Sequence, residues 1–128
     1  MPTLEDAISL AMEAHQGQRD KAGALYILHP LRVMLSMETE TEKIVAVLHD
    51  VVEDGGVTLD DLRKFGCSEE ILNAIGRLTR HDREDYDQFI DRVKSNPLAV
   101  KVKVADLKDN WNLKRIAEPK ENDYKRLE

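Results

Sequence analysis

Residues 39–56 read Thr-Glu-Thr-Glu-Lys-Ile-Val-Ala-Val-Leu-His-Asp-Val-Val-Glu-Asp-Gly-Gly, and their polar and apolar pattern indicates how the chain folds. Thr39 and Glu42 have the spacing of a capping box, in which each side chain accepts a hydrogen bond from the other residue's backbone at a helix start. The pair Gly55-Gly56 is typical of residues that follow a helix end. The sequence therefore predicts one helix from about residue 39 to about residue 54.

The predicted helix has two unlike faces at about 100° per residue. One arc is apolar and collects Ile44, Val45, Leu48, Val51 and Val52. The other arc is polar and collects His49, Asp50, Glu53 and Asp54. We expect the apolar arc to lie in a core and the polar arc to face a site or solvent.

Helix start and stop signals continue on both sides of this stretch. They predict further helices over about residues 3–16, 30–37, 58–65, 68–78, 85–95 and 97–117, with Thr3, His29, Thr58 and Ser68 at caps. The alternation of Val100, Val102 and Val104 with lysines also fits a short strand. A helical stripe through Val102 and Ala105, and the lack of a partner strand, favour a helix.

An all-α fold follows, which we expect to be a compact single-domain helical bundle over residues 1–128. The charge balance of 19 basic against 25 acidic residues argues against a nucleic-acid binder. No apolar run reaches the roughly 20 residues that span a bilayer, and no signal-peptide pattern is present, so we expect a cytoplasmic protein without a membrane partner. The single Cys67 excludes an intramolecular disulfide framework and a multi-cysteine zinc site.

The polar arc around His49 carries an unusual concentration of acid. Asp50, Glu53 and Asp54 would repel one another and raise each other's pKa values, and carboxylates near a helix C-terminus are also disfavoured by the helix dipole. A divalent cation removes this repulsion, and imidazole with carboxylate suits Mn²⁺, Fe²⁺ or Zn²⁺. The alternative interpretation is a solvated acidic face.

Two other groups of residues could complete such a site. Lys103, Asp106 and Asn110 share one face of the last helix, where they could bind a metal and an anionic substrate, although taken alone they fit an ordinary exposed face better. A histidine at a helix N-cap, as predicted for His29, is disfavoured from protonation, and neutral imidazole is the form that binds metals. Taken by itself, a histidine such as His29 more often has a packed or capping role.

Taken in order, residues 14–18, 26–30, 48–54, 57–62 and 103–110 resemble the motifs of HD-domain metal-dependent phosphohydrolases. More narrowly, they resemble the (p)ppGpp hydrolase domain of the Rel/SpoT proteins and its small stand-alone relatives. The resemblance implies an all-helical fold and hydrolysis of ppGpp and pppGpp at the 3′-pyrophosphate, with release of GDP or GTP and pyrophosphate.

The resemblance also assigns roles to individual residues. It implies that one Mn²⁺, or another divalent transition metal, is bound by His29, His49, Asp50 and Asp106. It implies that Glu53 and Asp54 activate the attacking water, and that Asn110 lies at the nucleotide. The basic residues available to the nucleotide substrate are Arg19, Lys21 and Lys103, and Arg77, Arg80, Lys101 and Arg115 are further cations that could reach phosphates.

Three residues depart from the family pattern. Asp20 stands where an Arg is usual, Leu107 replaces the Arg of the last motif, and Asp109 replaces a His that often precedes Asn110. These departures leave a different nucleotide or a phosphorylated metabolite open as the substrate. A non-catalytic helical module that retains a metal is the alternative from another functional class.

Overall fold

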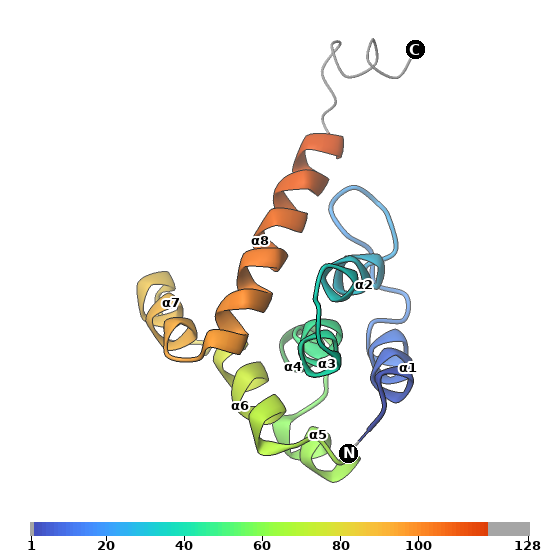
Figure 1. The fold of residues 1–128 in the computed structure, drawn as a ribbon. Coiled ribbons are helices and arrows are strands. Elements are labelled where there is room, and N and C mark those ends of the chain that lie inside the picture. Colours follow the sequence, from blue (N-terminus) through green and yellow to red (C-terminus); the bar gives the residue numbers. More distant parts are fainter. Residues whose placement is uncertain (1, 118–128) are drawn as a thin grey trace.

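The computed structural model describes the backbone of residues 2–117 and the side chains of residues 2–111. Over this part of the chain the elements are α1 (Leu4–Ala14), α2 (Leu28–Leu35), α3 (Glu40–Leu48), α4 (Val51–Asp54), α5 (Leu59–Phe65), α6 (Glu69–Leu78), α7 (Tyr86–Lys94) and α8 (Pro97–Ala117) (Figure 1). The described residues contain no strand, so the all-α prediction is confirmed. None of the described helices has the length and apolar character to cross a membrane.

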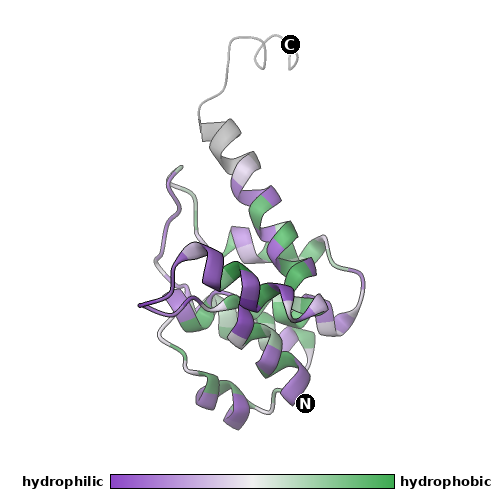
Figure 2. Cartoon of the chain, turned by 90° about the vertical axis from the view of Figure 1, so that its left-hand side faces the viewer, coloured by the Kyte–Doolittle hydropathy of each residue, from purple (hydrophilic) through white to green (hydrophobic). Residues whose placement is uncertain are grey.

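Helix α3 lies at the centre of the bundle, against α1, α2, α6 and α8 (Figure 1). Residues 44–48 have no exposed surface at all, so this helix is buried around its whole circumference. The predicted apolar arc was therefore too narrow, since Ala46 and Val47 are buried together with Ile44 and Leu48. Each large apolar side chain buried here contributes about 1.5–3 kcal/mol to folding. Figure 2 shows the same division, with hydrophobic residues gathered on the inward sides of the helices.

Side-chain caps begin most of the helices. Thr3, Thr39 and Thr58 each form a capping box, and Ser68 accepts from the Ile71 N–H, as the sequence predicts. A fourth capping box joins Asp85 to Gln88 at the start of α7. Such caps contribute about 1 kcal/mol each, and they position the short helices that surround α3.

The prediction of one continuous helix over residues 39–54 is wrong, because the chain breaks between α3 and α4. The Nδ1–H of His49 donates to the Ala46 carbonyl, which in a continuing helix would accept from the Asp50 N–H. The backbone N–H of His49 also donates to the Ala46 carbonyl at 3.4 Å, an i to i−3 bond that tightens the last turn where the helix ends. His49 and Asp50 therefore occupy a junction instead of a regular helix face.

The predicted cap at His29 is also wrong, because α2 begins two residues before the predicted start. Its first N–H groups are already satisfied by the preceding turn, in which Leu28 N–H donates to the Leu25 carbonyl and His29 N–H to the Tyr26 carbonyl. No side-chain cap is formed. His29 consequently lies inside the first turn, with Pro30 buried beside it.

The segment that could have been a strand is part of α8, the longest helix (Figure 1). Ala99 and Val102 are buried against the bundle, whereas Val104 is exposed. The helix packs against α2, α3, α6 and α7, which brings its middle turns beside the α3–α4 junction. This packing positions Asp106 close to residues from much earlier in the sequence.

Candidate metal centre

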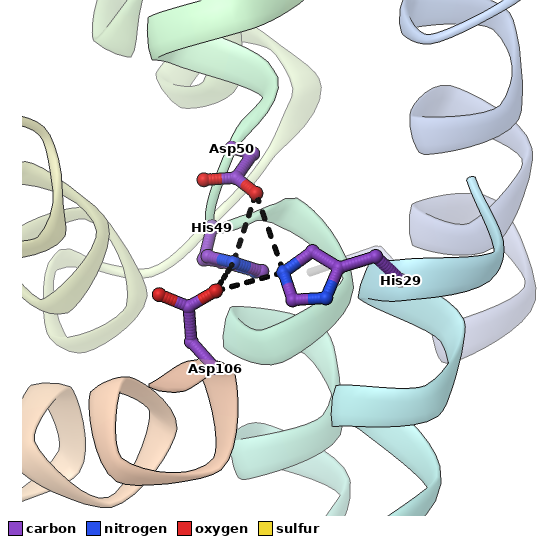
Figure 3. Close-up of side chains that lie close together, drawn as sticks. All are labelled: His29, His49, Asp50 and Asp106. Atoms are coloured by element: carbon purple, nitrogen blue, oxygen red, sulfur yellow. Dashed lines mark hydrogen bonds and ion pairs between the residues drawn. The ribbon is translucent and has the colours of Figure 1, made fainter. Parts of the chain in front are cut away.

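Four side chains from three parts of the chain converge at the α3–α4 junction (Figure 3). His29 comes from α2, His49 and Asp50 from the junction, and Asp106 from α8. One nitrogen or oxygen of each lies within 4.8 Å of the others, and this group could hold a metal ion. His29 Nε2 lies 2.7 Å from Asp106 Oδ1, and His49 Nε2 lies 3.0 Å from Asp50 Oδ2.

The junction leaves one ring nitrogen of His49 without a hydrogen-bond partner. Its Nδ1 donates to the Ala46 carbonyl, so a neutral ring presents a bare Nε2 to the cluster. That Nε2 is buried and makes no hydrogen bond, although Asp50 Oδ2 and Asp106 Oδ1 lie 3.0 and 3.4 Å away. A buried nitrogen lone pair facing two carboxylate oxygens is chemically suited to a cation.

Electrostatics within the cluster lead to the same conclusion. Burial alone would lower the pKa of His49, but the Asp50 and Asp106 carboxylates outweigh burial and raise that pKa to about 10. Burial also opposes the charge of Asp106, yet the hydrogen bond from His29 and the nearby His49 ring hold its pKa well below the usual range. The two carboxylates thus require nearby positive charge. When no ion is bound, a protonated His49 supplies that charge. A divalent cation would take the place of its Nε2 proton, and a donor set of two nitrogens and two oxygens suits borderline transition metals.

Neighbouring side chains hold both carboxylates in place. The Tyr26 hydroxyl donates to Asp50 Oδ2 at 2.5 Å, and Lys103 Nζ donates to Asp106 Oδ2 at 3.1 Å. Asn110 Nδ2 lies 3.4 Å from Asp106 Oδ1. The structure therefore brings Lys103 and Asn110 to the cluster. Sequence reasoning had included Tyr26 in a motif without giving it a role.

Asp109 and Arg32 extend the cluster on the far side of His29, and sequence reasoning missed this arrangement. His29 Nδ1 donates to Asp109 Oδ2 at 2.6 Å. Arg32 binds both oxygens of the same carboxylate, with Nε 2.7 Å from Oδ1 and Nη2 3.1 Å from Oδ2. The only signal in the sequence was that Asp109 departs from the family pattern. This departure could not be linked to His29 or Arg32 before the packing of α2 against α8 was known.

A pocket of about 170 Å³ opens beside the cluster. It is lined by His49, Asp50, Glu53, Leu78, Arg80, Tyr86, Phe89, Lys103 and Asp106. Glu53 lines this pocket and Asp54 does not. Partial burial and the negative charges of Asp54 and Asp50 raise the pKa of Glu53, and burial and Asp50 raise that of Asp54. A carboxylate with a raised pKa at the pocket wall is suited to accept a proton.

Several bacterial proteins align with most of this chain. A Vibrio cholerae protein named guanosine-3′,5′-bis(diphosphate) 3′-pyrophosphohydrolase is 31% identical over 84% of the chain. The "Probable GTP pyrophosphokinase" of Mycobacterium leprae is 31% identical over 98% of the chain. The bifunctional (p)ppGpp synthase/hydrolase SpoT of Escherichia coli is 30% identical over 84% of the chain.

The chain is a homologue of the Rel/SpoT proteins. It spans 17% of the length of each of these three relatives. No protein-family model matches the chain. The resemblance expected from the sequence motifs is thus confirmed, and the aligned segment contains the converging cluster.

In this Rel/SpoT homologue, the remaining predicted substrate residues lie on an exposed loop between α1 and α2. Arg19 and Lys21 are exposed, and Arg19 Nη1 donates to the Gly23 carbonyl within the same loop at 2.9 Å. Neither residue makes a contact with the cluster among the described side chains. The Asp20 carboxylate accepts from the Ala22 and Ala24 N–H groups, so this departure from the family pattern shapes the loop.

Of the further cations considered, only Arg80 lines the pocket beside the cluster within the described part of the chain. Lys101 pairs with Glu42 at 2.8 Å on a different face of α8. Arg77 is exposed at the end of α6, and the side chain of Arg115 lies outside the described residues. The sequence offered no way to choose between these four, because the choice depends on how α6, α7 and α8 pack.

Proposed function

We propose that this chain is a metal-dependent phosphohydrolase that removes the 3′-pyrophosphate of ppGpp or pppGpp. Water forms a bond to the phosphorus attached to the 3′ oxygen, the bond to that oxygen breaks, and GDP or GTP and pyrophosphate leave. The observation that supports this proposal best is the convergence of two histidines and two aspartates in a homologue of proteins named for that reaction.

The proposed cofactor is Mn²⁺, with His29, His49, Asp50 and Asp106 as its ligands. Two neutral imidazoles and two carboxylates balance the charge of a divalent ion, and the bare Nε2 of His49 gains a partner. Such an ion, when bound, polarises a phosphoryl oxygen and lowers the pKa of water. The same donor set also suits Fe²⁺ or Zn²⁺.

Glu53 is the proposed general base. It lines the pocket beside Asp50 and Asp106, and its raised pKa makes it a better proton acceptor than an ordinary glutamate. Asp54 contributes to this raised pKa through its negative charge. In this proposal, therefore, the two residues have unequal roles, with Glu53 taking the proton and Asp54 supporting its basicity.

Binding of the substrate's phosphates requires local positive charge, because the chain carries a net charge of −6. Lys103 and Arg80 line the pocket and supply this charge in the proposal. Asn110, Arg19 and Lys21 are assigned to the nucleotide through the family resemblance. Tyr86, which lines the same pocket and is 51% exposed, offers an aromatic ring to the substrate.

The engagement of Asp20 within its own loop favours a second candidate substrate class. Residue 20 is an aspartate whose carboxylate accepts from two backbone N–H groups, so the loop lacks the basic side chain that the family places there. A different nucleotide or a phosphorylated metabolite could then fill the pocket, with the same metal ligands and Glu53. A non-catalytic module that only retains metal would have no need of Glu53 at the pocket wall.

Release of pyrophosphate from ppGpp, with and without Mn²⁺, tests the proposed reaction, and pppGpp, GTP, ATP and NADPH serve as competing substrates. We expect Mn²⁺-dependent release of pyrophosphate from ppGpp, abolished by a chelator. The Glu53→Gln variant should lose turnover by about 10²–10⁴-fold while it still binds Mn²⁺. Metal binding without turnover of any of these compounds would contradict a hydrolase and favour the non-catalytic module.

A further inference from the structure

We propose that Asp109, clamped by Arg32, is the positioning residue that aims His29 at the metal. This inference rests on the proposed metal site, and it assigns a role to one of the three departures from the family pattern. It is based on the contacts of His29 on the side of the ring away from the cluster.

Asp109 determines which nitrogen of His29 carries a proton. A carboxylate only accepts hydrogen bonds, so the His29 Nδ1 that lies 2.6 Å from Asp109 Oδ2 must be protonated. His29 Nε2 lies 2.7 Å from Asp106 Oδ1 and donates to that carboxylate when no ion is bound. A cation bound between Nε2 and Asp106 would replace this second proton, whereas the proton on Nδ1 keeps its partner Asp109. Asp109 thus selects the one tautomer that can bind a metal at this position.

Arg32 fixes the carboxylate of Asp109 in turn. Its Nε and Nη2 bind the two oxygens at 2.7 and 3.1 Å, and this fork geometry restricts the rotation of the carboxylate more than a single contact would. The His29 and Asp109 side chains are 3% and 13% exposed, so water competes weakly for their hydrogen bond. The ring of His29 is therefore held from α2 and α8 together.

The same arrangement explains how the chain accommodates Asp109 at a position where the family often has a histidine. The aspartate is one turn of helix away from Asp106, on the side of α8 that faces α2. Its negative charge is balanced by Arg32, which lies on α2 one turn beyond His29. Two residues that contact no proposed substrate thus complete the support of one metal ligand.

Titration with Co²⁺, followed by its visible absorption and by calorimetry, tests this role without measuring turnover. Asp109→Asn should weaken Co²⁺ binding by about 10- to 100-fold and alter the Co²⁺ absorption spectrum, because the amide no longer enforces the tautomer. Asp91→Asn is the matched control, since it makes the same chemical change at an exposed position on α7. The Co²⁺ affinity and spectrum of this control should equal those of the unmodified chain.

Arg32→Gln is a second variant that tests the same role if Asp109→Asn does not fold. This variant leaves the His29–Asp109 pair and removes only the clamp, so Co²⁺ affinity should fall by a smaller factor. Equal Co²⁺ affinity and spectra in the Asp109, Arg32 and Asp91 variants would overturn the inference alone. Absence of Co²⁺ binding by the unmodified chain would overturn the proposed metal site and this inference together.

Discussion

The ligand cluster and the loop between α1 and α2 are held in opposite ways. The cluster joins α2, the α3–α4 junction and α8 through contacts between residues far apart in the sequence, and its histidines are buried. The loop is held mainly by contacts within itself, such as Asp20 with Ala22. Substitutions in the cluster should therefore remove function, whereas substitutions in the loop should adjust substrate preference.

Contacts near both ends of the loop link it to the other region. Near its end, the Tyr26 hydroxyl donates to Asp50 Oδ2 at 2.5 Å. Gln18 Nε2 donates to the Asp54 carbonyl at 2.8 Å, and Gln18 Oε1 lies 3.0 Å from His15 Nδ1. The loop is thus anchored at its start to the end of α4, close to the proposed general base. Positions 19–21, beyond this anchor, remain exposed or half-buried.

The largest effect is expected from Asp106, the proposed metal ligand on α8. Asp106→Asn keeps the shape of the side chain but removes its charge, so Mn²⁺ affinity should fall by more than about 100-fold and pyrophosphate release should reach background. Calorimetry and the release assay measure both effects, with circular dichroism to check the fold. Mn²⁺ affinity equal to that of the unmodified chain would show that α8 is not part of the centre.

The second largest effect separates the two acids of α4. Because Glu53 lines the pocket and Asp54 does not, Glu53→Gln should lower kcat by about 10²–10⁴-fold and Asp54→Asn by less. Steady-state kinetics at saturating Mn²⁺ compares them directly. A larger loss for Asp54→Asn would reverse the roles proposed for the pair.

A smaller effect concerns the segment between α6 and α7, where Arg92 binds Glu84 and the Thr79 carbonyl, and the pocket residue Arg80 donates to the Glu84 carbonyl. The hydrogen bond from Arg92 holds the pKa of Glu84 at about 2, below its usual value of 4.5. A depressed folded-state pKa stabilises the fold above the unfolded pKa, and this contribution is lost as pH falls from 4.5 toward about 2.

Urea unfolding as a function of pH tests the contribution of Glu84. Glu84→Gln should be less stable than the unmodified chain at pH 6, and the two should converge as the pH falls through that window. Glu70→Gln, at an exposed position on α6, serves as the control and should follow the unmodified chain throughout. A constant difference between Glu84→Gln and the unmodified chain at all pH values would mean that the charge of Glu84 is irrelevant.

The smallest effect is expected in the loop. Lys21→Ala should raise the KM for ppGpp by up to about fivefold and leave the Mn²⁺ affinity unchanged, because an exposed ion pair contributes about 0.2–1 kcal/mol. Lys94→Ala, an exposed lysine on α7, is the control for general charge effects. A change in Mn²⁺ affinity on substitution of Lys21 would contradict the expectation that the loop affects substrate binding and not metal binding.

Local signals in the sequence predicted the helices and their caps well, because capping boxes such as Thr39 with Glu42 depend only on neighbouring residues. The break after Leu48 was not predictable from periodicity, because it depends on a hydrogen bond that the His49 side chain donates to the Ala46 carbonyl. The start of α2 was missed for a related reason, as backbone groups of the preceding turn replace the expected cap.

The proposed ligands could be nominated from the sequence only because motifs in a fixed order resemble a known family. Their convergence depends on how α2, α3 and α8 pack, and that is a property of the folded chain. The same limit explains why Asp109 was noticed as a departure while its contacts with His29 and Arg32 were not. Arg80 likewise emerged as a pocket residue only once the position of α7 was known.

The wide spacing of the four converging side chains along the sequence has a consequence for folding. An ion bound by them would cross-link α2, the α3–α4 junction and α8, and the chain could not unfold without releasing it. The free energy of unfolding would then rise with the free concentration of the ion, by about 2.7 kcal/mol when that concentration is a hundred times the dissociation constant. The protein would become more resistant to heat and proteases as a result. The amount of intact protein would in this way depend on the supply of the metal.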